Sequence, residues 1–125
     1  MLSRNSRYKT IAHGGENMSV YSIREISDRV RPVAKEYGTG AIYLFGSYAR
    51  GSATEESDVD LLVDAENVHG FKFFGLYPAF EEALGKPVDI VTMDVLYEQY
   101  KDDEYVSELR NAIEKDRRLI YDGKG

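Results

Sequence analysis

Two aspartates two residues apart are the first feature of the chain that could do chemistry. Asp58 and Asp60 flank Val59 in an apolar segment that predicts a β-strand over residues 58–63. Side chains two apart on a strand point to the same face, so both carboxylates would lie side by side. Such carboxylates repel each other and raise each other's pKa unless a cation lies between them. Because Mg²⁺ prefers oxygen ligands, the pair predicts either a divalent metal site or a solvated strand edge.

A glycine–serine pair precedes these aspartates, with ten residues between Ser47 and Asp58. Gly46 and Ser47 follow the apolar segment 41–45, which predicts a buried strand. Glycine directly after a strand allows a ligand to approach the backbone closely. Ser47 would lie at the start of a short helix, where free N–H groups and a hydroxyl can hold phosphate oxygens. The sequence therefore predicts a phosphate cradle and a metal-binding pair on successive elements.

A third acid, Asp89, is alone within the apolar segment 87–92, which predicts another strand. An acid in such surroundings is costly unless it is paired or bound to a metal. If this strand lies beside the strand over 58–63, Asp89 joins Asp58 and Asp60 around two metal ions. That arrangement suits two-metal phosphoryl transfer, in which one ion activates a hydroxyl and the other holds the triphosphate and the leaving pyrophosphate.

Two nearby acids are weaker candidates for the same role. Asp64 has the strand parity of Asp60, but four residues place it roughly 13 Å away. Asp94 lies five residues beyond Asp89, which reverses the parity and takes it past the end of the strand. We therefore expect both Asp64 and Asp94 to be surface or capping residues.

Apolar spacing predicts the elements that would position these groups. Ser22 is a suitable N-cap for a helix that contains Pro32, which should bend it. The predicted helices and strands alternate along the chain as 22–37, 41–45, a short helix within 46–54, 58–63, 71–84, 87–92 and a last helix around Val106, Leu109 and Ile113. The aromatic stripe of the fifth segment, Phe73, Tyr77, Phe80 and Leu84, predicts core packing, and residues 119–121 are a short apolar stretch. This order predicts an α/β domain with a small mixed sheet and flanking helices.

Composition restricts the class of protein. A length of 125 residues suits one domain, and 42% hydrophobic with 30% charged residues is typical of a globular chain. The absence of cysteine excludes disulfides, thiolate metal sites and thiol catalysis, and no apolar run approaches the roughly 18 residues of a membrane span. We expect a cytoplasmic protein. The net charge of −6 argues against a stable partnership with duplex nucleic acid, although metal-bridged binding of a nucleoside triphosphate is compatible with it.

The N-terminal residues 1–17 are polar and without a sustained period, so we expect a flexible tail before a folded domain over 18–125. Gly15-Glu16-Asn17-Met18 can be encoded by GGA-GAA-AAC-ATG, which is similar to a bacterial ribosome-binding site before a start codon. Translation from Met18 instead of Met1 is therefore an alternative start.

The segments FGSYARGSATEESDVDLLV and VDIV together resemble the DNA polymerase β nucleotidyltransferase superfamily, and most closely its minimal nucleotidyltransferase group. The resemblance covers residues 22–122, and its motif positions are matched by Gly46, Ser47, Asp58, Asp60 and Asp89. It implies that the glycine–serine pair contacts the nucleotide phosphates, that the three acids bind Mg²⁺, and that the third acid is also the general base. Arg50 lies at the pattern's usual basic position, where it would contact phosphate or form a structural salt bridge.

The resemblance implies transfer of AMP from ATP to an acceptor hydroxyl. Many larger members carry a helical acceptor-binding domain that is missing here, so we expect the acceptor on a partner protein or at a site formed by a homo-oligomer. The minimal group implies a helical HEPN ribonuclease toxin as partner, with this chain as the antitoxin that adds AMP to a tyrosine near the toxin's active site. Two alternatives are neutralisation by binding alone and modification of a small molecule such as an aminoglycoside.

Overall fold

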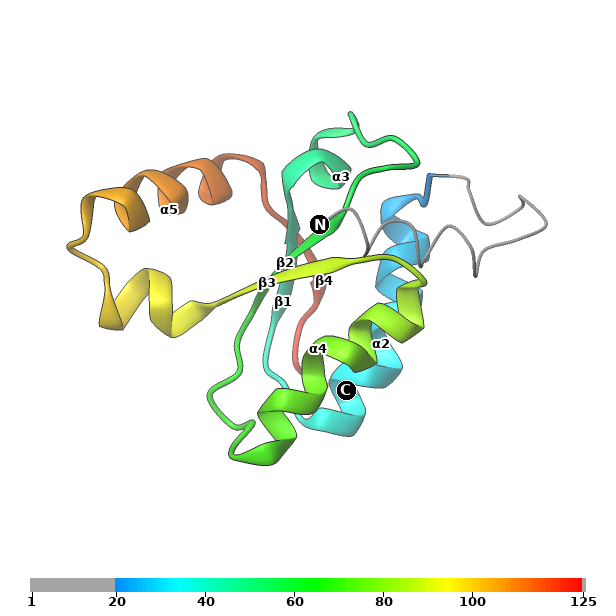
Figure 1. Cartoon of the computed structure of the whole chain (residues 1–125), viewed down its shortest axis with the longest axis horizontal. Helices are drawn as coiled ribbons and strands as arrows, with labels where there is room; N and C mark the ends of the chain where they lie inside the picture. The colour runs from blue at the N-terminus through cyan, green and yellow to red at the C-terminus, as the bar shows by residue number, and fades with distance from the viewer. Residues whose placement is uncertain (1–19, 125) are drawn as a thin grey trace.

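The computed structural model describes residues 20–124, which form a four-stranded mixed sheet with helices on its two faces (Figure 1). In chain order the elements are α2 (Ile23–Tyr37), β1 (Ile42–Phe45), α3 (Gly46–Arg50), β2 (Val59–Val63), α4 (Phe71–Leu84), β3 (Val88–Thr92), the π-helix η2 (Val95–Gln99), α5 (Glu104–Asp116) and β4 (Arg118–Tyr121). The strand order is β3-β2-β1-β4, with β1 antiparallel to both neighbours and β2 parallel to β3. This architecture confirms the predicted mixed sheet with flanking helices.

Helix α2 begins at a capping box. The Ser22 hydroxyl accepts a hydrogen bond from the Glu25 amide at 3.0 Å, and the Glu25 carboxylate accepts one from the Ser22 amide at 2.8 Å. These two bonds satisfy backbone donors that have no partner within the helix. The helix continues through Pro32 and ends at Gly38, which adopts the left-handed conformation with φ of 73°.

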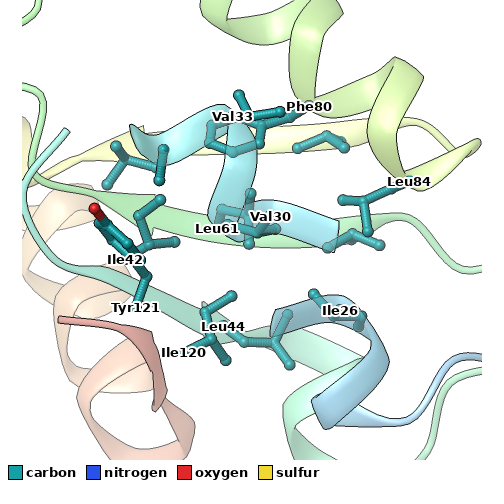
Figure 2. Packing of buried hydrophobic residues seen from close by; sticks show 14 of the residues in the cluster. Ile26, Val30, Val33, Ile42, Leu44, Leu61, Phe80, Leu84, Ile120 and Tyr121 are labelled. Carbon is teal, nitrogen blue, oxygen red and sulfur yellow. The ribbon is translucent and has the colours of Figure 1, made fainter. Parts of the chain in front are cut away.

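The larger core lies between α2, α4 and one face of the sheet (Figure 2). Strand alternation supplies its sheet side: Val59, Leu61 and Val63 are fully buried, as the parity of the aspartates predicted. Leu76, Phe80 and Leu84 supply the side of α4. Asp60, at an even position of β2, therefore cannot lie on this face, and Asp58 directly precedes the strand.

The opposite face is covered less completely. Its cluster has only three buried members, Leu62 of β2, Leu96 of η2 and Ile113 of α5. Tyr43 and Val91 pack against that cluster and are partly exposed. By strand parity, Asp60 and Asp89 lie on this second face, the face that carries α5 and η2.

Two sequence-based interpretations need correction. The aromatic stripe of α4 is core only in part, because Phe80 and Leu84 are buried while Phe73 and Tyr77 are 37% and 42% exposed. Phe73 points within about 20° of Phe80 around the helix, so it is exposed because it lies in the first turn of α4 and not because it is on another side of the helix. The apolar stretch at residues 119–121 is part of strand β4, which pairs with β1.

The expected tail over residues 1–17 and the alternative start at Met18 lie outside the described residues. Between residues 20 and 124, no helix combines the length and apolar character that a bilayer crossing needs.

Candidate active site

Gly46 lies directly against the carboxylate of Asp60. It follows β1 with φ of 77°, and the register pairs its neighbour Phe45 with Asp60. A Cβ atom at Gly46 would overlap Asp60 Oδ2 and would lie 3.0 Å from Asp60 Cγ. Only glycine combines this backbone conformation with this approach. The predicted cradle and the predicted acidic pair are therefore in contact.

Asp60 and Asp89 are partners in the parallel register of β2 and β3. The two strands are neighbours, which was the condition for grouping Asp89 with the aspartate pair. Burial raises the pKa of Asp60 to about 7, and the charges of Asp89 and Asp58 and a hydrogen bond with Asp89 add to that effect. Near neutral pH, Asp60 therefore keeps its proton in part of the molecules, because a buried carboxylate beside other carboxylates ionises only at a cost.

The donor set of this cluster suits a hard divalent cation. All three groups are carboxylates, and the mutual repulsion that raises the pKa of Asp60 is what a bound cation would relieve. As they stand, no three Asp, Glu or His side chains of residues 20–124 form a group that could hold a metal ion. Binding of a cation would therefore require the carboxylates to reorient and Asp60 to release its proton.

Helix α3 holds the predicted phosphate cradle, Gly46 and Ser47, in place. The Ser47 carbonyl accepts hydrogen bonds from the amides of Gly51 and Ser52, which closes the short helix. The next residue, Tyr48, is 4% exposed and belongs to the larger core. Ser47 itself is half-buried at the second position of the helix. This anchoring holds Gly46 and Ser47 at the end of β1.

Lys86 is a site residue that the sequence analysis missed. Its Nζ donates a hydrogen bond to the Glu55 carbonyl at 2.9 Å and lies 5.7 Å from the centre of the Tyr48 ring. Burial lowers the pKa of Lys86, while the negative charges of Asp58, Glu56 and Glu55 oppose that shift. The positively charged ammonium group of Lys86 therefore lies near the acids, between β3 and the loop over residues 51–57. A basic residue three positions before the lone strand acid was the available sequence signal.

Arg50 forms a salt bridge with Asp116 of α5 at 3.3 Å, with the Arg50 side chain 52% exposed. It is also close enough to Asp60 that its charge lowers the pKa of that acid. Of the two roles expected for Arg50, the salt bridge is therefore present, and contact with phosphate stays a prediction.

The two competing acids have local structural roles. Asp64 accepts a hydrogen bond from the Glu66 amide at 3.2 Å in the turn after β2. Asp94 is the N-cap residue of η2, although its side chain does not cap the first turn. Neither belongs to the group of charges that raises the pKa of Asp60.

Comparison with known proteins agrees with this geometry. The family model of the nucleotidyltransferase domain matches residues 23–120. A Methanocaldococcus jannaschii protein whose name provisionally assigns it as the protein adenylyltransferase MJ1379 is 37% identical, over 79% of this chain and 93% of its own length. A solved minimal nucleotidyltransferase is 30% identical with a TM-score of 0.59, over 80% of this chain and 97% of that one.

A more distant likeness extends the fold comparison. A solved complex of a tri-AMPylated Shewanella oneidensis HEPN toxin with its MNT antitoxin matches with a TM-score of 0.54 and 17% identity, over 80% of this chain and 72% of that one. At that identity the likeness supports the fold. The family model covers both the Gly46 turn and all three acids. The chain therefore belongs to the nucleotidyltransferase domain family, and it is a nucleotidyltransferase of the minimal type.

Proposed function

We propose that this protein is a metal-dependent adenylyltransferase that transfers AMP from ATP to a tyrosine of a partner HEPN ribonuclease toxin, and that it thereby acts as the toxin's antitoxin. The observation that carries the proposal is the contact of Gly46 with Asp60, together with the pairing of Asp60 and Asp89. The glycine turn that would bind phosphate thus lies against carboxylates that repel each other when no cation is bound.

In this reaction Gly46 and Ser47 would bind the triphosphate, and Asp58, Asp60 and Asp89 would hold two Mg²⁺ ions. The ions, when bound, would neutralise the carboxylates and stabilise charge on the triphosphate. Asp89 is the exposed member of the three acids, so its carboxylate can take the proton of an incoming hydroxyl. The acceptor oxygen forms a bond to the α-phosphorus, the bond from that phosphorus to the bridging oxygen breaks, and pyrophosphate leaves.

The choice of acceptor is supported by the comparisons. The relative MJ1379 is named for AMP transfer to protein, at an identity of 37%. The fold neighbour from Shewanella oneidensis is an antitoxin bound to an AMPylated HEPN toxin. Both support a protein acceptor over a small molecule.

The test first asks whether the adjacent reading frame encodes a helical HEPN ribonuclease, and then measures transfer of radiolabelled AMP from ATP to that protein. We expect the Asp58→Asn, Asp60→Asn double variant to lose about three orders of magnitude in rate, because several kcal/mol of charge stabilisation is removed. Asp28→Asn is the matched control, since Asp28 is an exposed aspartate of α2 outside the acidic cluster, and this variant should label the toxin normally. A toxin variant with phenylalanine at the labelled tyrosine should accept no AMP.

Three results would contradict the proposal. Full neutralisation by the double variant, with no label on the toxin, would show an antitoxin that acts by binding alone. Labelling of an aminoglycoside by the purified protein without any partner would show a small-molecule enzyme. Full transfer in the presence of excess EDTA would exclude the dependence on Mg²⁺.

A further inference from the structure

An apolar groove of about 340 Å³ lies at the free edge of the sheet, between α4, β3 and α5. Phe73 and Tyr77 of α4 form one wall, Ile90 of β3 forms the floor, and Tyr105 and Leu109 of α5 form the other wall. In Figure 1, β3 leads from the end of α4 into the arm made by η2 and α5. The groove therefore follows the edge of the sheet where the coverage by helices changes from one face to the other.

Three of the exposed aromatic side chains line this groove: Phe73, Tyr77 and Tyr105. Six of the eight large hydrophobic side chains that are exposed within residues 20–124 are aromatics of α4 and of the segment from η2 to α5: Phe71, Phe73, Phe74, Tyr77, Tyr100 and Tyr105. Phe74 and Tyr105 are each 73% exposed. Large aromatic side chains left exposed beside an apolar groove are typical of a surface that binds another protein.

The backbone edge of β3 is already occupied from α4. The Val88 amide donates to the Glu81 carboxylate at 3.1 Å, and the Ile90 amide donates to the Tyr77 hydroxyl at 3.1 Å. A partner strand would need these donors in order to add to the sheet. The groove therefore fits the side chains of a helix and does not fit an added strand.

An acidic hollow of about 670 Å³ adjoins the groove and shares Phe73 and Thr92 with it. Four carboxylates line the hollow, and neither lysine nor arginine does: the acids are Asp64, Glu66, Asp94 and Glu98. A helix seated in the groove would therefore gain from a basic side chain that reaches this hollow.

The groove also begins beside the acids of the site. Val91, which also lines the groove, lies two residues after Asp89 in β3 and on the same face of the sheet, and Asp89 is exposed. Anything held in the groove is thus held next to the carboxylate that would take the acceptor's proton. Proximity of this kind lowers the barrier by fixing the reacting groups in advance.

We propose that this groove is the docking site for a helix of the acceptor protein, one with an apolar face and a basic side chain at one end. Docking there places the acceptor hydroxyl beside Asp89. The inference rests on the proposed function, because the docked protein is the HEPN ribonuclease that receives AMP.

The test compares a Phe73→Ala, Tyr105→Ala double variant with Leu119→Ala, a control on β4 at the other edge of the sheet that is 53% exposed. We measure the KM for the HEPN ribonuclease, the KM for ATP, the dissociation constant of the complex and the Tm. The groove variant should raise both the KM for the ribonuclease and the dissociation constant at least tenfold. Its KM for ATP and its Tm should stay at the wild-type values, and the control should match wild type throughout.

A second pair of variants tests the charge of the partner. Asp94→Asn with Glu98→Gln should slow association with the ribonuclease and weaken its dependence on salt.

An unchanged KM for the ribonuclease in the groove variant would overturn the inference while wild-type AMP transfer still supports the proposed function. Conversion of a wild-type dimer to a monomer, with that KM unchanged, would show that the groove joins two copies of this chain. If wild type binds the ribonuclease but transfers no AMP, the proposed function fails, and loss of binding in the groove variant still supports the docking site.

Discussion

Gly46 and Asp60 constrain each other at the centre of the site. The glycine is fixed by its positive φ and by the Asp60 carboxylate that fills the space of its missing side chain. Gly51 ends the same short helix with a similar φ of 82°, but no atom lies within 4 Å of the position its Cβ would take. The two glycines therefore share a left-handed backbone conformation, which would strain any other residue, and differ in contact with the acids.

This difference makes a matched pair of substitutions. Gly46→Ala and Gly51→Ala should each lower the free energy of unfolding by about 1 kcal/mol through the strain of a left-handed alanine. Only Gly46→Ala should also push Asp60 out of place, so we expect it to abolish AMP transfer while Gly51→Ala keeps at least half of the wild-type rate. Thermal denaturation and labelling of the ribonuclease measure the two effects. Equal losses of rate in both variants would contradict the role of the Gly46–Asp60 contact.

The raised pKa of Asp60 predicts how stability depends on pH. An unfolded Asp60 loses its proton near pH 3.8, whereas the folded protein keeps it to about pH 7. Between these values the folded state binds more protons, so the free energy of unfolding should fall as the pH rises, by a few kcal/mol at most. In EDTA, Asp60→Asn should lack this fall, so its Tm advantage over wild type should grow from about pH 5 to about pH 8.

Adding Mg²⁺ to the same measurements separates repulsion from metal binding. Because the cation binds the ionised carboxylates, Mg²⁺ should raise the Tm of wild type more at high pH than at low pH. Asp60→Asn should respond little. Parallel Tm curves for the two proteins in EDTA would contradict the raised pKa of Asp60.

At the scale of elements, the loop over residues 51–57 is held to the sheet by Lys86. The ammonium group joins the Glu55 carbonyl of the loop to the start of β3 and lies over the Tyr48 ring of α3. A hydrogen bond from a charged donor contributes about 1.5–3 kcal/mol. Three elements of the site are thus connected by one side chain.

Replacement of Lys86 by methionine keeps the apolar stem and removes this connection. We expect amide hydrogen exchange of residues 51–57 to become about tenfold faster, as loss of roughly 1.5 kcal/mol implies. Lys72→Met is the control, because the Lys72 Nζ lies 5.8 Å from the Tyr37 ring in a similar contact away from the acids. Unchanged exchange in the Lys86 variant would show that the loop is held by other contacts.

Strand alternation was enough to predict which face carries the acids, because parity is a local property of sequence. That Asp60 and Asp89 would be partners depended on the order of the strands, which arises from packing of the whole sheet. β4 was missed because four residues, Arg118–Tyr121, carry little pattern of their own and become a strand by pairing with β1. Lys86 was missed for a similar reason, since its partners come from other elements.

The same limit explains the error on α4. Helical spacing places Phe73 and Tyr77 near the buried line, but whether they are covered depends on what lies beyond the edge of β3. Within the described residues that edge has no further strand. The exposed aromatics that looked like core in the sequence are therefore the ones that form the proposed docking groove.

At the scale of the whole molecule, the two faces of the sheet have different roles, one in stability and one in the candidate active site. One face packs on α2 and α4 and holds the larger core, and the other carries the acids with α5 and η2. Among residues 20–124, the buried core residues lie between Ile26 and Tyr121. Immediately before them, the Tyr21 hydroxyl donates to the Leu84 carbonyl at 2.6 Å and Ser22 caps α2. The folded unit should therefore need residues from about position 20 onward.

Two truncations test this boundary. A chain that starts at Met18 should keep the Tm and the AMP-transfer rate of the full chain, because it retains Tyr21 and the capping box. A chain that starts at Ile23 loses the Tyr21–Leu84 hydrogen bond and the Ser22 cap, so its free energy of unfolding should fall by about 2 kcal/mol. An equal loss of Tm in both chains would place the boundary earlier. Mass spectrometry of the native N-terminus is the companion measurement: a peptide that contains Arg7 or Lys9 would exclude translation from Met18 alone, whereas a first residue at Met18 would make the shorter chain the natural protein.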